Sequence, residues 1–314
     1  MSTDVESARS SQPTPEYSDE LHAEVLEDLR IGEHGYKYRL VEGIVMPPFI
    51  TPSRYALSRT IETRPDDICY NGYPKSGTNW LANILVRLVN QGEAPSDRTL
   101  RDSVHWVESS IEYPRSKAEL DAAPSPRIFH SHMPFHMALG GDPLGNPCRY
   151  VYIARNPKDV AVSYFHFESR APWAGQYDGE WPHWLSMFLG GKLQRGDWFD
   201  HVLGWWRHRD APNVHFLRYE DLLRNFGAEL RRLGAFLGYD LSDDVVRAIE
   251  ERTAFANMKQ DSFSNLREIS ELSHFFRKGV IGSWKERFTV LESEWFDEIY
   301  RERMRGSGLD FDFV

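Results

Sequence analysis

Apolar residues along the chain form short continuous runs that alternate with longer stretches in which they recur every three or four positions. The short runs predict strands at 68–72, 127–130, 149–154 and 214–219. The longer stretches predict helices at 77–90, 157–168, 198–208, 220–237, 243–251 and 291–303. Strands that alternate with helices imply parallel βαβ units, so the predicted fold class is α/β, with one parallel sheet flanked by helices.

The N-terminal part of the chain has a different pattern. Residues 1–17 hold Ser, Thr, Pro and Glu with almost no large apolar side chain, which predicts a disordered tail. Residues 18–30 predict a short helix, because apolar residues recur there at intervals of four, and residues 43–52 form an apolar, Pro-rich connector. From 18 to 314 there is one composition regime, so we expect a single domain.

The charge balance narrows the functional classes. The chain has 314 residues, with 37 Lys and Arg against 47 Asp and Glu, and its formal net charge is −10. A field of this sign argues against non-specific nucleic-acid binding. A small anionic ligand would need a local basic pocket that works against the overall field.

Cysteine usage and hydropathy indicate the compartment. The two cysteines argue against a disulfide framework, and no His/Cys/Asp cluster has ligand spacing, so no metal is expected. No apolar run is long enough to span a bilayer, and the polar, acidic N-terminus is unlike a secretory signal. We therefore expect a cytoplasmic protein with no membrane partner.

The segment 73–80, Tyr-Pro-Lys-Ser-Gly-Thr-Asn-Trp, lies between a predicted strand and a predicted helix. Gly77 allows close approach of the backbone to a ligand, the helix start offers free N–H groups, and Lys75 adds a full charge. Gly72 and Gly77 have the glycine spacing of a Walker A loop, yet Thr78-Asn79 stands where that motif needs Lys-Ser/Thr. The segment therefore predicts a loop that binds an anion and resembles a P-loop. The alternative interpretation is an ordinary strand-to-helix turn without a ligand.

Three segments together resemble the cytosolic sulfotransferases, which use 3′-phosphoadenosine 5′-phosphosulfate (PAPS). The segment 73–80 is similar to the family's 5′-phosphosulfate loop. The segment 151–164, Val-Tyr-Ile-Ala-Arg-Asn-Pro-Lys-Asp-Val-Ala-Val-Ser-Tyr, is similar to the block that binds the 3′-phosphate. The segment 277–285, Arg-Lys-Gly-Val-Ile-Gly-Ser-Trp-Lys, resembles the segment that closes over that phosphate. The resemblance extends over roughly 67–303 and implies PAPS as co-substrate.

The resemblance assigns residues to the cofactor site, and five of them, from Trp80 to Met258, surround the adenine. An aromatic residue that follows a phosphate loop is otherwise more often part of the core. The residues assigned to the cofactor are Lys75, Ser76, Gly77, Thr78, Asn79, Trp80, Arg155, Ser163, Tyr219, Thr253, Phe255, Met258, Arg277, Lys278 and Gly279.

Sulfonyl transfer needs a base near the acceptor and cations at the leaving phosphate. The resemblance makes His132, in Phe-His-Ser-His-Met-Pro, the general base, although a single histidine is more often a packed or surface residue. It also makes Lys75 the cation at the leaving phosphate and Ser163 the residue that restrains Lys75. Family members often carry Lys two residues before the catalytic histidine, whereas this chain has His130, which removes a fixed charge near the acceptor or makes that charge depend on pH.

The acceptor is a small molecule that the sequence does not name. Candidate contacts are Trp106, His130, Phe135 and Phe167, and aromatic walls suit an apolar or planar acceptor. The region 173–184 is expected to form a lid, with a mobile loop over 171–182 that is rich in Gly, Pro and Trp. The sequence does not distinguish among phenols, steroids, aliphatic alcohols, amines and polar natural products as acceptors.

The segment 285–294 fits Lys-x3-Thr-Val-x3-Glu, the short dimerisation signature of the same family, which implies a homodimer. The function predicted is transfer of a sulfonyl group from PAPS to a hydroxyl or amine of a small molecule. Two alternatives stay open: a P-loop nucleotide kinase or NTPase, and a non-catalytic relative that binds 3′-phosphoadenosine 5′-phosphate (PAP).

Overall fold

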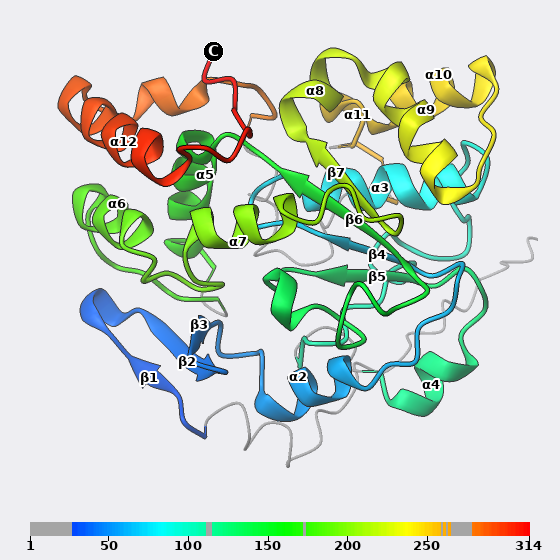
Figure 1. The fold of residues 1–314 in the computed structure, drawn as a ribbon, viewed down its shortest axis with the longest axis horizontal. Helices are drawn as coiled ribbons and strands as arrows, with labels where there is room; N and C mark the ends of the chain where they lie inside the picture. The colour runs from blue at the N-terminus through cyan, green and yellow to red at the C-terminus, as the bar shows by residue number, and fades with distance from the viewer. Residues whose placement is uncertain (1–26, 111–114, 172–173, 259, 262, 265–277) are drawn as a thin grey trace, which may run out of the picture.

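A computed structural model describes residues 27–110, 115–171, 174–258, 260–261, 263–264 and 278–314. Its centre is a four-stranded parallel sheet in the order β5-β4-β6-β7 (Figure 1). The strands are β4 (Ile68–Asn71), β5 (Ile128–Ser131), β6 (Arg149–Ala154) and β7 (Val214–Arg218). The predicted class, an α/β fold with a parallel sheet flanked by helices, is confirmed.

Alternation along the buried strand β6 divides the core into two layers. Tyr150, Tyr152 and Ala154 face a cluster that includes residues of α5 (Pro157–Glu168), α6 (Trp181–Leu189), α7 (Trp198–Trp206) and α12 (Val290–Arg303). Val151 and Ile153 face the other cluster, with residues of α3 (Thr78–Val89), α8 (Tyr219–Arg224), α9 (Phe226–Leu237) and α10 (Asp243–Thr253). Helices on both faces explain why β4 and β6 are buried along almost their whole length and are mostly apolar.

The order of the strands in the parallel sheet determines where a ligand-binding site can form. Strand β4 lies between β5 and β6, so the chain leaves β4 and returns once on each side of it. In open parallel sheets a crevice forms at the carboxyl ends of the strands where the order reverses. The residues that follow β4, β5 and β6 are the phosphate loop, His132 and Arg155, and all three therefore meet at one edge of the sheet.

A second, antiparallel sheet lies in the N-terminal part, which the sequence left without strands. It consists of β1 (Arg30–Ile31), β2 (Lys37–Val41) and β3 (Ile44–Met46), so the expected connector 43–52 contains a strand. The carbonyl of Val45 accepts a hydrogen bond from the backbone N–H of Arg195 at 2.7 Å. Shorter helical elements are η1 (Glu33–Gly35), α2 (Pro52–Arg59), α4 (Lys117–Ala122), η2 (Phe135–Met137), α11 (Phe255–Met258) and η4 (Ser283–Glu286).

Three expectations about local structure need correction. The helix expected at 220–237 is two helices, because the backbone at Asn225 (φ −131°, ψ 49°) is not helical. The expected mobile loop at 171–182 is packed where it is described: Trp181 is buried, and in α6 Trp184 donates to the carbonyl of Ala161 at 3.2 Å. Residues 27–30 form a turn and the start of β1, whereas the tail 1–17 and most of the helix expected at 18–30 lie outside the described residues.

A buried ion pair joins the starts of β4 and β5. The Arg127 guanidinium donates to both carboxylate oxygens of Asp67, at 2.9 and 2.5 Å, and to the carbonyls of Leu120 and Glu62. Both side chains are almost completely buried. Removing one partner leaves the other charge buried and uncompensated.

We expect Asp67→Ala to lower the free energy of unfolding by about 3–5 kcal/mol, because it strands the Arg127 charge in the core. Urea denaturation of both proteins measures the difference. Asp97→Ala is the matched control, since Asp97 pairs with Arg98 at the exposed surface, and it should cost less than about 1 kcal/mol. Equal effects of the two substitutions would contradict the account of the Asp67 pair.

Candidate active site

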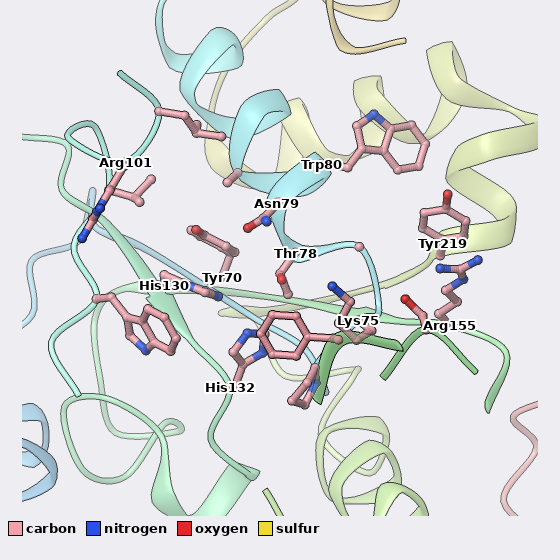
Figure 2. A pocket seen from close by; sticks show the side chains of 18 of the residues that line it. Tyr70, Lys75, Thr78, Asn79, Trp80, Arg101, His130, His132, Arg155 and Tyr219 are labelled. Atoms are coloured by element: carbon pink, nitrogen blue, oxygen red, sulfur yellow. The ribbon is translucent and has the colours of Figure 1, made fainter. Parts of the chain in front are cut away.

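A cavity of about 440 Å³ opens at the edge of the sheet where β4, β5 and β6 end. Figure 2 shows Lys75, His132 and Arg155 directed into it from three separate segments. Of the residues predicted for the cofactor, those that line the cavity are Lys75, Gly77, Thr78, Asn79, Trp80, Arg155, Ser163, Tyr219, Thr253, Phe255, Met258, Lys278 and Gly279. Arg277 lies outside the described residues, and Ser76, which is a residue of the loop, is fully buried and does not line the cavity.

The phosphate loop has a backbone that ordinary side chains would not adopt. Gly77 has φ 106° and begins α3, and a Cβ there would lie 2.7 Å from the ring of Tyr219. Lys75 also has a positive φ of 70°, and its ammonium lies 4.5 Å from the centre of the Phe167 ring. Within the described part of the chain, the buried Ser76 hydroxyl has no hydrogen-bond partner. The loop therefore combines one unpartnered hydroxyl with the start of helix α3, which fits an anion.

Arg155 and Lys278 bring two further cations to the cavity. Arg155 is 93% buried, and its guanidinium lies 4.4 Å from the centre of the Tyr219 ring and donates to the carbonyl of Val280 at 3.0 Å. Lys278 pairs with Glu286. The carboxylate of Asp159, one turn after Arg155, accepts from the backbone N–H groups of residues 282 and 284 at 2.9 Å each. Helix α5 therefore anchors the segment that carries Lys278.

An aromatic group closes the end of the cavity beside Arg155. The rings of Trp80 and Tyr219 meet edge to face at 5.3 Å, as Figure 2 shows from their labelled side chains. Phe255 packs against Gly279, where an added Cβ would approach the ring to 2.5 Å. The hydroxyl of Thr253 donates to the carbonyl of Ile249, so the methyl group is the part of this side chain that can contact a ligand in the cavity. These surfaces suit a flat, apolar ring.

His132 is held by its neighbours in one tautomer. Its Nδ1–H donates to the carbonyl of Gly72 at 2.6 Å, which leaves Nε2 as an acceptor. The backbone carbonyl of His132 accepts from Nε2 of His201 at 3.0 Å, and Nδ1 of His201 accepts from the hydroxyl of Tyr152 at 2.8 Å. His201 therefore fixes the backbone that carries His132.

Three of the four predicted acceptor residues line the cavity. His130 stacks on Tyr70 with 4.9 Å between ring centres, and its ring lies 4.7 Å from that of Trp106 and 4.6 Å from that of His132. Phe167 contributes its ring beside Lys75. Phe135 does not line the cavity; it stacks on His208 at 3.9 Å because η2 turns it toward α7.

The chain matches the model of the sulfotransferase domain over residues 65–308, which include every described residue of the phosphate loop and its neighbouring segments. The chain belongs to the sulfotransferase family. Human sulfotransferase 1C2 is 34% identical over 286 residues, covering 88% of this chain and 95% of the relative. Dog sulfotransferase 1B1 is 36% identical over 266 residues, covering 79% and 87%.

Solved structures agree with this assignment. A crystal structure of mouse sulfotransferase SULT7A1 complexed with PAP is 30% identical, has a TM-score of 0.72, and is matched over 86% of this chain and 95% of that one. A structure of retinol dehydratase with androsterone and PAP shares the fold, with 21% identity, a TM-score of 0.77 and coverage of 96% and 100%. None of the described helices of this sulfotransferase is long and apolar enough to cross a membrane.

Positive charge gathers at the cavity of this sulfotransferase although its net charge is −10. Among its described lining residues the carboxylates are Glu168 and Glu250, and the cations are Arg54, Lys75, Arg101, Arg115, Arg155, Arg195 and Lys278. The cavity is thus the local basic pocket that an anionic ligand would require.

Burial and nearby positive charge set the protonation of the histidines. Burial, and then electrostatic interactions with His130 and Arg195, hold the pKa of His132 well below its usual range near 6.5. Burial and Arg195 lower the pKa of His130 to about 3, and burial lowers that of His201 to about 3. Burial raises the pKa of the Glu168 carboxyl to about 8. At neutral pH the three histidines are therefore neutral, and His132 is ready to accept a proton.

Sequence reasoning missed His201, Glu168 and Arg195, which belong to the surroundings of this site. His201 lies on the buried face of α7, where one histidine among aromatic residues gave no signal. Arg195 precedes Gly196 in a loop, and nothing in the local sequence distinguishes it from an arginine at the surface. Only the approach of β3 to this loop brings it to the cavity.

One cluster of metal-binding side chain types lies elsewhere. Ligand atoms of Glu33, His34 and His183 come within 4.8 Å of one another, although their spacing in the sequence gave no metal motif. His183 already bonds to Tyr177 at 2.9 Å and to Glu33 at 2.7 Å. These contacts account for its position without an ion.

The histidine assignment predicts that neither His130 nor His132 titrates near neutral pH in the folded protein. In a two-dimensional proton–carbon NMR experiment, the ring signals of His130 and His132 should stay constant from about pH 8 down to about pH 5.5, because both rings remain neutral across that interval. In urea the same histidines should titrate near ~6.5. A midpoint near 6.5 for His132 in the folded protein would contradict the burial argument.

Proposed function

We propose that this chain transfers a sulfonyl group from PAPS to a hydroxyl or amine of a small-molecule acceptor. The observation that carries the proposal is the meeting of Lys75, Arg155, Lys278 and His132 at one cavity. Membership of the sulfotransferase family and the PAP complex of a relative that is 30% identical support the same donor.

The residues present fit the nucleotide. The phosphate loop, with Lys75, the unpartnered Ser76 hydroxyl and the start of α3, would hold the 5′-phosphosulfate. Arg155, Ser163 and Lys278, with Arg277 by resemblance, would hold the 3′-phosphate, for which a planar guanidinium is well suited. The aromatic end formed by Trp80, Tyr219 and Phe255, together with Thr253 and Met258, would hold the adenine.

His132 is the proposed general base. When bound, PAPS supplies an electrophilic sulfur, which bonds to the acceptor oxygen or nitrogen as its bond to the 5′-phosphate breaks. Nε2 of His132 takes the proton that the acceptor loses. The hydrogen bond from Nδ1 to the carbonyl of Gly72 fixes the tautomer, and the lowered pKa keeps Nε2 unprotonated at neutral pH.

Lys75 is the proposed cation at the leaving phosphate. A positive charge at the oxygen that gains negative charge lowers the barrier most when it is already in place. Before reaction the Lys75 ammonium lies over the Phe167 ring, and Ser163 lies one helical turn earlier on the same helix. We assign Ser163 the role of holding Lys75 away from the phosphate until an acceptor occupies the cavity.

PAP, and not Mg²⁺–ATP, should stabilise the protein against heat, by about 2.7 kcal/mol at a hundredfold excess over the dissociation constant. His132→Ala should keep this stabilisation, because it removes no phosphate contact, while turnover of PAPS with a competent acceptor falls by about 10²–10⁴-fold. Thermal shift and PAP release measure the two effects.

His136→Ala is the matched control, because His136 is an exposed histidine four residues further along the chain. It should retain turnover. Stabilisation by Mg²⁺–ATP alone would favour a nucleotide kinase or NTPase. Tight PAP binding without transfer to any of a broad set of acceptors would favour a binding protein, and full activity of His132→Ala would remove the base assignment.

We also propose a homodimer through residues 285–294. Val290 and Leu291, at the start of α12, are each 76% exposed, and Trp295 is 40% exposed, which makes this an apolar surface patch. Thr289 caps α12 through a capping box with Glu292, so the patch has a rigid backbone. Lys285 and Glu294 lie at its ends and can pair across a two-fold axis.

Val290→Glu should convert the dimer to a monomer in sedimentation velocity, because it places like charges opposite each other at the axis. A glutamate in the first turn of a helix is favourable, so the fold should be unaffected. Leu144→Glu, at another exposed apolar position, is the control and should stay dimeric. A wild-type protein that sediments as a monomer at tens of micromolar would contradict the proposal.

A further inference from the structure

Arg195 places a buried guanidinium at the wall of the cavity without an oxygen partner. The residue is 97% buried and lines the cavity. Its side-chain contacts are to two thioether sulfurs, at 3.4 Å from Met46 Sδ and 3.8 Å from Met133 Sδ. Sulfur is a weak acceptor, and among the described residues no carboxylate or carbonyl oxygen lies within bonding distance of the guanidinium.

The backbone, and not an ion pair, holds Arg195 there. Its φ of 74° is unusual for a residue with a side chain, and such strain persists only where the surroundings enforce it. The N–H of Arg195 donates to Val45 in β3, and the preceding residue, Gln194, bonds to the carbonyl of Lys37 at 3.1 Å. The N-terminal sheet therefore directs the guanidinium into the cavity.

The nucleotide does not account for all the charge at the cavity. Lys75, Arg155 and Lys278 have proposed phosphate roles, whereas Arg54, Arg101, Arg115 and Arg195 do not. Figure 2 shows Arg101 on the side of the cavity opposite Tyr219 and Arg155, beyond His130. Arg54 donates to the carbonyl of residue 115, and Arg115 donates to that of Asp102, so these two are tied to the wall. Among the described residues, Arg195 is held only by the hydrogen bond of its backbone N–H to Val45 and by the contacts of its guanidinium with the sulfur atoms of Met46 and Met133.

The carboxyl groups whose charges act on Arg195 bond to other groups, and neither bonds to its guanidinium. His130 and His132 lie within its electrostatic reach and are neutral at pH 7. Glu168 accepts from the N–H of Gly175, and burial raises the pKa of this carboxyl to about 8. Glu108 accepts from the hydroxyl of Ser131 at 2.7 Å, and burial also raises its pKa. A guanidinium in such surroundings would gain strongly from an anion in the cavity.

We propose that Arg195 is a specificity-determining residue that binds a carboxylate on the acceptor. The acceptor class is then an aromatic hydroxyl compound that bears an acid group apart from the hydroxyl that is sulfonated. This inference rests on the proposed sulfonyl transfer. In this arrangement Arg195 brings a fixed positive charge close to His130 and His132 from another segment of the chain.

A matched pair of acceptors tests the proposal. With PAPS, the wild-type kcat/KM for para-hydroxyphenylpropanoate should exceed that for its amide by roughly 10- to 100-fold, the range of a charge-assisted hydrogen bond. Calorimetric titration of the PAP-saturated protein should show the same preference in binding. The amide keeps the ring, the hydroxyl and the size, so the ratio reports on the charge alone.

Three variants assign the preference to Arg195. Arg195→Met should reduce the ratio of acid to amide to near one, and Arg195→Lys should retain part of it. Arg207→Met removes an exposed arginine at the end of α7 and should leave the ratio as in the wild type. Stabilisation of each variant by PAP verifies that the nucleotide end of the site is folded.

The outcomes separate this proposal from the proposed function. Turnover of the amide with no preference for the acid overturns the role of Arg195 and leaves sulfonyl transfer standing. A wild-type preference that Arg195→Met keeps overturns it as well, because another arginine would then bind the acid. Failure of PAP to stabilise the protein, with no transfer to either compound, overturns both proposals.

Discussion

Like charges that line one cavity repel one another, and this molecule depends on holding them together. The cations meet at the carboxyl edge of β4, β5 and β6, in a chain with a net charge of −10. Backbone groups and buried carboxylates help to keep them in place, beside the ion pairs of Lys278 with Glu286 and of Arg155 with Asp159. Asp159 binds the segment that carries Lys278 through two N–H groups, and Val45 binds the N–H of Arg195. The result is a preorganised positive field, which is what binding a highly charged nucleotide and stabilising a leaving phosphate both require.

The same arrangement explains the chemistry proposed for His132. Cations near a histidine lower its pKa, because they disfavour a second positive charge, and burial acts in the same direction. The cavity that attracts phosphate therefore also keeps Nε2 of His132 free of a proton. The carbonyl of Gly72, the last residue before the phosphate loop, orients the ring by accepting from Nδ1. One short segment thus contributes both the phosphate cradle and the tautomer of the proposed base.

Local sequence patterns predicted most of the central fold. Strand β6 and helix α5 have the bounds expected from their apolar runs and from Pro157 at the start of the helix. Most of the predicted cofactor residues line the cavity, because the segments that follow β4, β6 and β7 meet at one edge of the sheet and residues of α10, α11 and 278–279 complete its wall. The N-terminal sheet escaped prediction, since its strands are only two to five residues long, which is too short for an apolar period to show. The prediction of a mobile loop and lid around Trp181 and Trp184 was wrong, because the Gly and Pro residues near them indicated a loop, whereas their side chains are buried in the core. Arg195 could not be predicted, because its place at the cavity depends on contact with β3.

A crystal structure of the protein with bound PAP tests the central claim most directly. The account predicts the 5′-phosphate on the backbone of residues 75–79, the 3′-phosphate between Arg155 and Lys278, and the adenine beside Trp80. It also predicts that the space between His132, Phe167 and Arg195 stays open for an acceptor. A nucleotide bound elsewhere, or with its phosphates on Arg101 and Arg195 in place of Arg155, would contradict the division of the cavity into a donor end and an acceptor end.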